Sequence, residues 1–242
     1  MKKLTVETAE ELASKMRVSL HVSSSEPLNI KTTLRLLGIL TVYRPLSPGL
    51  WGLSLKSADE KRFILVSSNA TRGSQHFTIA HELFHLYYDE NPQPHFLKQS
   101  NVTDIAERSA NLFASALLMP REGLSFYIPD KELVNRTISV DTAIKLEQLF
   151  GVSHATLLIR LKELKMATPQ NLEVLKKVSI TREAKLRGFD TALYAPGNDG
   201  LIIGDYGIKA KRLFDTEKIS EGHYLELLSM IEYEESKDRP RC

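Results

Sequence analysis

The chain has 242 residues, enough to bury a sizeable core in one large domain or two small ones. Its apolar fraction of 42% is ordinary for a globular protein, and 32 basic against 30 acidic residues give a formal charge of +2, which excludes a global attraction to nucleic acid or anionic lipid. The only cysteine, Cys242, excludes a disulfide framework and a thiolate zinc cluster. With no secretory leader and no apolar run near the ~20 residues of a membrane span, we expect a cytoplasmic protein without a membrane partner.

The first part of the chain predicts two helices and a small sheet. Apolar residues recur at helical spacing in residues 8–18, and residues 29–37 are a second predicted helix that Gly38 would close in the left-handed conformation. Two β-rich runs, 39–43 and 62–67, are predicted strands. The second of them could be the sheet edge to which an extended substrate backbone adds.

The next predicted helix, residues 74–88, carries a metal-binding motif, His-Glu-Leu-Phe-His at 81–85. Because His81 and His85 are four residues apart, both imidazoles can reach one ion from the same face of a helix. Two neutral imidazoles suit zinc, and Glu82 beside the ion could take a proton from water, as in a metalloprotease. The alternative is a chance match on a surface helix.

A second long helix, residues 103–118, supplies a third ligand. A catalytic zinc of this type needs three protein ligands and one open position. Glu107 is the best candidate, because it opens a helix whose small residues would let it lie close to the histidine helix. Asn111, four residues later, could hydrogen-bond the far nitrogen of a ligand histidine, or Glu107 itself. Alternatively, Glu107 is a solvated glutamate that the helix dipole favours.

Two other histidines are weaker ligand candidates. A regular helix turns His76 away from the site, so we interpret it as a surface or capping residue. His95 follows a proline-rich loop that could fold back, but we interpret it as an ordinary loop residue.

The second half of the chain begins with a predicted helix pair. Residues 141–150, a turn at 151–153 and residues 155–164 are arranged as in a helix-turn-helix. A DNA-binding role is one interpretation, but the second helix is largely apolar and offers few base-reading side chains. We therefore interpret it as a packed pair, and the basic residues beyond it, as far as Arg187, as a solvated or partner-facing surface.

The C-terminal part predicts short β-structure and one more helix. Residues 191–194 and 201–203 are β-like, and a turn at 196–200 separates them. The last predicted helix spans residues 223–233.

Two stretches of the sequence extend the motif at 81–85 into a longer pattern. Residues 78–86 are Thr-Ile-Ala-His-Glu-Leu-Phe-His-Leu, and residues 107–120 are Glu-Arg-Ser-Ala-Asn-Leu-Phe-Ala-Ser-Ala-Leu-Leu-Met-Pro. Together they resemble the ImmA/IrrE family of bacterial and phage metallopeptidases, and the resemblance extends over residues 27–165. One departure is Phe84, where the family commonly has glycine. It should alter the packing behind the helix without touching the ligands.

The resemblance implies a role for each residue of the motif. His81, His85 and Glu107 would bind one zinc ion, and Glu82 would be the general base. Characterised relatives cleave a partner repressor with a helix-turn-helix fold, so the resemblance implies a site-specific, regulatory zinc endopeptidase with a protein substrate of that kind. Direct nucleic-acid binding is not expected. The alternatives are a DNA-binding regulator or a toxin–antitoxin partner, with a structural or vestigial metal site.

These features predict an α+β fold in three parts. A zincin-like peptidase core, with a small sheet, the histidine helix and the glutamate-ligand helix, is expected at residues 1–130. A helical, helix-turn-helix-like segment packed on this core is expected at 131–180. A small α/β extension of unassigned role is expected at 181–242.

Overall fold

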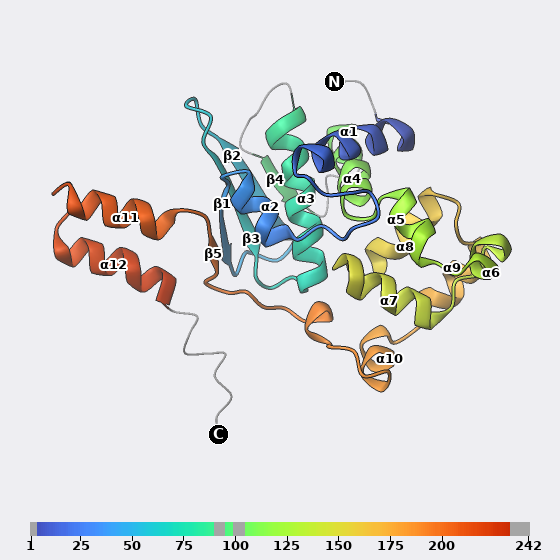
Figure 1. Cartoon of the computed structure of the whole chain (residues 1–242). Helices are drawn as coiled ribbons and strands as arrows, with labels where there is room; N and C mark the ends of the chain where they lie inside the picture. Colours follow the sequence, from blue (N-terminus) through green and yellow to red (C-terminus); the bar gives the residue numbers. More distant parts are fainter. Residues whose placement is uncertain (1–3, 90–94, 99–104, 233–242) are drawn as a thin grey trace.

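The computed structural model describes residues 4–89, 95–98 and 105–232 (Figure 1). The strands are β1 Leu40–Arg44, β2 Leu50–Lys56, β3 Arg62–Ser67, β4 His95–Lys98 and β5 Ile202–Ile203. The helices are α1 Val6–Ser19, α2 Ile30–Leu36, α3 Arg72–Tyr88, α4 Ile105–Leu118, α5 Arg121–Tyr127, α6 Asp130–Asn135, α7 Val140–Phe150, α8 His154–Glu163, α9 Pro169–Lys176, α10 Ile180–Leu186, the 3-10 helix η1 Ala192–Tyr194, α11 Tyr206–Asp215 and α12 Glu221–Glu232. The chain therefore has a mixed α+β fold.

Side-chain caps explain where several of the helices begin. An oxygen of the N-cap side chain accepts a hydrogen bond from a backbone N–H three residues later at Thr5, Asn29, Thr71, Ser139, Ser153 and Thr168. The helices predicted at 8–18, 29–37, 74–88, 103–118, 141–150 and 155–164 are confirmed as α1, α2, α3, α4, α7 and α8. Residues 103 and 104 of the fourth prediction lie outside the described residues.

The five described strands form one sheet in the order β4-β2-β3-β1-β5. β1 and β3 are parallel, and the other neighbouring pairs are antiparallel. The strands predicted at 39–43, 62–67 and 201–203 are confirmed as β1, β3 and β5. The prediction that 62–67 forms an edge is wrong, because β3 uses its backbone groups to pair with β1 on one side and β2 on the other.

The sequence pattern does not predict β2. Its two buried positions hold Gly52 and Ser54 rather than the β-branched or aromatic residues that favour strands. Both small residues face α3. A Cβ at Gly52 would lie 2.6 Å from Cγ2 of Thr78 and 3.0 Å from the carbonyl oxygen of Leu65, so β2 lies closer to α3 than a larger side chain would permit.

α3 is covered on several sides. It packs on β2 and β3 and also on α4, which in turn packs on α1 (Figure 1). Every residue of α3 from 78 to 86 is buried, as expected for a helix with neighbours around it. Phe84 fills the space toward α4, with its ring centroid 5.7 Å from that of Phe113. The polar residues of the motif at 81–85 therefore lie in the core rather than on the surface.

α7 and α8 form the predicted helix pair, joined through Gly151 at φ 64°. α8 packs against α4, α7 and α9. The guanidinium of Arg160 is fully buried, donates to the carbonyl oxygen of Met119 and pairs with Glu10 and Glu163. Arg160 therefore adds no positive charge to the surface, because its charge is neutralised inside the protein.

The segment after α10 crosses the N-terminal end of α3 before it joins the sheet. The side-chain amide of Asn198 donates to the side-chain oxygen of Gln75 on α3, and β5 then pairs with β1. The prediction of β-structure at 191–194 is wrong. The carboxylate of Asp190 accepts the backbone N–H of Ala192, a local turn that starts η1 instead.

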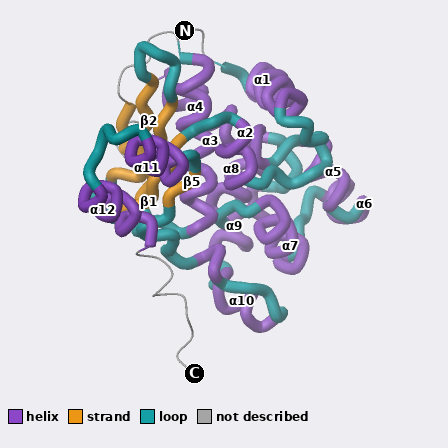
Figure 2. The backbone as a smooth tube through the Cα atoms, turned by 60° about the vertical axis from the view of Figure 1, so that its left-hand side comes forward, coloured by secondary structure: helices purple, strands orange, loops and turns teal. Residues whose placement is uncertain are grey.

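α11 and α12 form a hairpin beside the sheet, apart from the helices α5–α10 (Figures 1 and 2). The rings of Phe214 and Tyr224 stack between the two helices with centroids 4.9 Å apart. The predicted helix 223–233 is confirmed as α12, and residue 233 lies outside the described part of the chain. None of the helices described is long and apolar enough to cross a membrane.

Candidate metal centre

α3 and α4 bring His81, His85 and Glu107 together. The Nε2 atoms of His81 and His85, one helical turn apart, lie 3.2 Å from each other. Glu107, in the first turn of α4, places Oε2 3.5 Å from Nε2 of His81 and Oε1 3.5 Å from Nε2 of His85. One ligand atom from each residue lies within 4.8 Å of the others. We call these three residues the His–His–Glu cluster.

The His–His–Glu cluster is almost completely shielded from solvent, because none of its residues is more than 4% exposed. α4 can approach α3 because it carries small buried residues, among them Ala110 and Ala114. A glutamate buried to this extent is costly unless opposite charge or hydrogen-bond donors compensate it. The burial therefore argues against Glu107 as a solvated residue at a helix start.

Each histidine of the cluster is held through its other ring nitrogen. Nδ1 of His81 lies 2.9 Å from Oδ1 of Asn111, and Nδ1 of His85 lies 3.2 Å from Oδ2 of Asp89. These oxygens are acceptors, so Nδ1 of each ring donates to them, which in a neutral ring leaves the lone pair on Nε2. The lone pair of each Nε2 then points into the cluster.

The His–His–Glu cluster thus gathers acceptor atoms: two Nε2 lone pairs and the oxygens of one carboxylate. A cation placed between these atoms would be attracted by all of them. Two imidazole nitrogens and a carboxylate form a donor set of catalytic zinc sites, in which a further position admits water or substrate. The residues present therefore fit a divalent metal ion.

Glu82 is also fully buried, but its carboxylate faces β2 rather than α4. Its Oε2 accepts a hydrogen bond from the hydroxyl of Ser54 on β2 at 2.6 Å. Because consecutive helix residues are turned by about 100°, Glu82 faces the sheet while the adjacent His81 faces α4. The site thus has a carboxylate next to the His–His–Glu cluster in addition to that of Glu107.

The sequence did not predict Ser54 and Asp89 at this site. Asp89 could have been found, because it follows His85 at the same four-residue spacing that relates the two histidines. Ser54 carries no such signal. It is 28 residues from Glu82 in the chain and lies on a strand that the pattern does not predict.

The other candidate histidines, His76 and His95, lie on α3 and at the start of β4. Nδ1 of His76 lies 2.8 Å from the carbonyl oxygen of Gly151, and burial lowers the pKa of the imidazole. His76 therefore joins α3 to the turn between α7 and α8. The backbone of His95 pairs with Ser54 in β4, so the interpretation as a loop residue is wrong, and its side chain lies outside the described residues.

A second histidine–carboxylate cluster lies between α7, α8 and η1. Nδ1 of His154 lies 2.5 Å from Oε1 of Glu147, Nε2 lies 3.0 Å from the carbonyl oxygen of Leu175, and the hydroxyl of Tyr194 donates to Oε2 of Glu147. Both partners of the imidazole are acceptors, so both ring nitrogens carry hydrogens. Burial lowers the pKa of His154, but the hydrogen bond and charge of Glu147 outweigh it, and the pKa is raised. We call Glu147, His154 and Tyr194 the Glu147 cluster.

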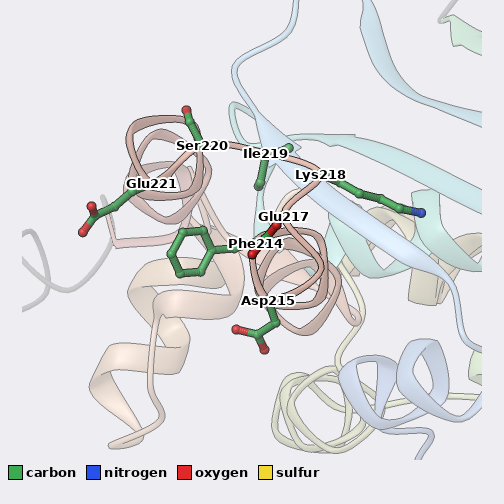
Figure 3. Close-up of a pocket in the computed structure, with 7 residues that line it drawn as sticks. All are labelled: Phe214, Asp215, Glu217, Lys218, Ile219, Ser220 and Glu221. Carbon is green, nitrogen blue, oxygen red and sulfur yellow. The ribbon is translucent and has the colours of Figure 1, made fainter.

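Two surface hollows lie apart from these residues. One, of about 570 Å³, is at the turn of the α11–α12 hairpin, where Asp215, Lys218 and Glu221 point away from one another (Figure 3). Another, of about 440 Å³, is lined by α1 and the end of α4. Neither is lined by the His–His–Glu cluster. The diverging charges of the first hollow form no convergent set of polar groups that could orient a ligand.

A buried His–His–Glu cluster with a further glutamate on the histidine helix defines a metallopeptidase type of site. Residues 35–162, just over half of the chain, match the M78 peptidase family, described as the IrrE N-terminal-like domain. The chain belongs to the ImmA/IrrE family of metallopeptidases. The match runs from α2 to α8 and so contains the whole cluster, but not β5 or the hairpin. No curated protein matches the chain.

Proposed function

We propose that this chain is a cytoplasmic, zinc-dependent endopeptidase that cuts a helix-turn-helix transcriptional repressor at a specific site. The observation that carries the proposal is the convergence of acceptor atoms in the His–His–Glu cluster, beside the separate carboxylate of Glu82. Membership of a peptidase family supports peptide hydrolysis as the reaction.

The residues of the site divide the chemistry between them. His81, His85 and Glu107 would hold the ion. When bound, zinc supplies Lewis acidity, which polarises a peptide carbonyl and lowers the pKa of water toward neutrality. Glu82 takes one proton as the oxygen of water adds to the carbonyl carbon. The carbon–nitrogen bond then breaks, and Glu82 passes that proton to the leaving amine, so that one water is consumed and Glu82 ends ionised as it began.

Asn111 and Asp89 support the ligands rather than the reaction. By accepting Nδ1–H of His81 and His85, they fix the tautomer in which Nε2 has a lone pair for the ion. The same contacts fix the ring orientation and raise the basicity of the ligand nitrogen. We therefore assign both residues to the outer hydrogen-bonding layer of the metal centre.

A helix-turn-helix repressor is the substrate we infer, because the chain resembles family members that cleave such a partner. The DNA-binding alternative has less support. α8 directs Arg160 into the body, and its outer side carries the apolar Ile159, which offers no hydrogen bond to a base edge. Duplex binding with a steep salt dependence would favour that alternative.

Co-expression with a helix-turn-helix repressor encoded beside this chain tests the proposal. The native chain should cleave the repressor, and Glu82→Gln, which keeps the side-chain size but removes the base, should not. Glu122→Gln, an exposed carboxylate in the first turn of α5, should cleave like the native chain. Cleavage that survives Glu82→Gln would exclude Glu82 as the base. A repressor left intact by the metal-loaded native chain would exclude this substrate and favour a binding partner, as in a toxin–antitoxin pair.

A further inference from the structure

The hydroxyl of Ser54 contacts the carboxylate that the proposed reaction uses as a base. Oγ of Ser54 donates to Oε2 of Glu82 at 2.6 Å, and the two residues are 2% and 0% exposed. Hydrogen bonds to an ionised carboxylate are about twice as strong as neutral ones. In a buried site, water does not compete for the acceptor. The contact is therefore a strong link between β2 and α3.

The spacing of β2 and α3 makes this link possible. Gly52 and Ser54 share one face of β2, opposite Thr78 and Glu82 on α3. Two residues along a strand advance about 6.7 Å and four along a helix about 6 Å. Ser54 therefore lies opposite Glu82, just as Gly52 lies opposite Thr78. A Cβ at Gly52 would meet Cγ2 of Thr78 at 2.6 Å. Glycine at 52 thus lets β2 lie close enough for Ser54 to reach the carboxylate.

Glu82 needs an external contact to hold its carboxylate in one orientation. The last torsion of a glutamate side chain is broad and roughly two-fold, so the helix alone does not set the plane of the carboxylate. Ser54 is well suited to set it, because its strand is in register with Ile64 on β3 and His95 on β4. Its short side chain has a single heavy-atom torsion. Misplacing a reacting group by about 1 Å can lower a rate about 100-fold.

We propose that Ser54 is a positioning residue that holds Glu82 through Oε2 in the orientation for proton transfer. This proposal rests on the proposed role of Glu82 as the base. Ser54 acts on Glu82, whereas the ligand imidazoles are held by Asn111 and Asp89. Removing its hydroxyl should therefore lower the rate and leave the metal content unchanged.

Ser54→Ala tests the positioning role, with Ser54→Thr as the conservative variant. Ser67→Ala, another buried strand serine at 4% exposure, is the matched control. With the repressor as substrate, Ser54→Ala should lower kcat by ~10–100-fold at unchanged KM and zinc content. Ser54→Thr should restore most of the rate, and Ser67→Ala should keep the native rate. An unchanged kcat in Ser54→Ala, or an equal loss in Ser67→Ala, would overturn the proposal.

A crystal structure of Ser54→Ala separates this proposal from the proposed function. If the native chain leaves the repressor intact, the proposed substrate is wrong, but the hold on Glu82 can still be observed. We expect one conformer of the Glu82 side chain in the native crystal and more than one in Ser54→Ala. A single, unmoved conformer in the variant would overturn the positioning role whatever the reaction.

Discussion

The His–His–Glu cluster and the Glu147 cluster differ in where their histidine nitrogens point. In the Glu147 cluster, His154 directs both ring hydrogens at acceptors, and Glu147 also accepts the hydroxyl of Tyr194. In the His–His–Glu cluster, Nδ1 of each ring faces Asn111 or Asp89 on the outside, and the two Nε2 atoms converge with the carboxylate of Glu107 at the centre. A metal centre is therefore marked by ligand atoms that converge on one point, rather than by residue types alone.

Replacing a metal ligand should distinguish the His–His–Glu cluster from the Glu147 cluster most clearly. His81→Ala and Glu107→Ala should each lose the ~one zinc ion per chain that the native protein retains after dialysis, because two ligands no longer enclose the ion. His154→Ala should retain it, since both nitrogens of that ring are already engaged. Metal analysis by mass spectrometry measures the content. Undiminished zinc in Glu107→Ala would move the third ligand elsewhere.

Asn111→Ala tests the hydrogen bond at the outer edge of the His–His–Glu cluster. Nδ1–H of His81 loses its acceptor, so the ring is less firmly oriented and zinc affinity should fall by ~10–100-fold. Titration against a chromophoric chelator measures the affinity. Asn135→Ala, an exposed asparagine at the end of α6, is the control and should bind zinc like the native chain. Equal affinities for the two variants would exclude this role for Asn111.

The Glu147 cluster should stabilise the fold in a pH-dependent way. The pKa of His154 is raised above the ~6.5 of an unfolded histidine, so its contribution is complete below that pH and is lost as pH rises through the folded pKa. His154→Gln should lower the free energy of unfolding by about 2 kcal/mol on the acid side, and by less as pH rises. Urea unfolding over a pH series measures the difference. A difference that grows with pH would contradict the assigned protonation.

Tyr194→Phe should have the smallest effect. Burial, followed by the charge of Glu147, raises the pKa of Tyr194, so the hydroxyl stays protonated and remains a donor at neutral pH. Removing the hydroxyl should lower the free energy of unfolding by about 1 kcal/mol, the net contribution of one hydrogen bond. Zinc content should not change. A variant that loses zinc would show that the two clusters are coupled and would contradict their independence.

The local parts of this site could be predicted from the sequence. The four-residue spacing of His81 and His85 and the helical pattern around Glu107 depend on neighbours in the chain, and the structure brings the three residues together. The same holds for the paired helices α7 and α8, which have clear capping and turn residues.

The long-range parts could not be predicted in this way. Strand β2 has no β-branched residue, and the small residues at its buried positions are explained only by its packing against α3. The pattern of neighbouring residues therefore does not indicate that Ser54 belongs to the site, although its hydroxyl contacts Glu82 directly. The burial of Arg160 likewise depends on Glu10, distant in sequence, which neutralises its charge. Contacts of this kind follow from the folded arrangement rather than from periodicity.

X-ray absorption spectroscopy at the zinc edge tests the proposed metal centre most directly. For the native chain purified with its metal, we predict two imidazole nitrogens at about 2.0–2.1 Å together with oxygen ligands. The spectrum of His154→Ala should be the same, because His154 belongs to the Glu147 cluster. A coordination shell without imidazole, or one that changes when His154 is replaced, would contradict a metal centre built from His81, His85 and Glu107.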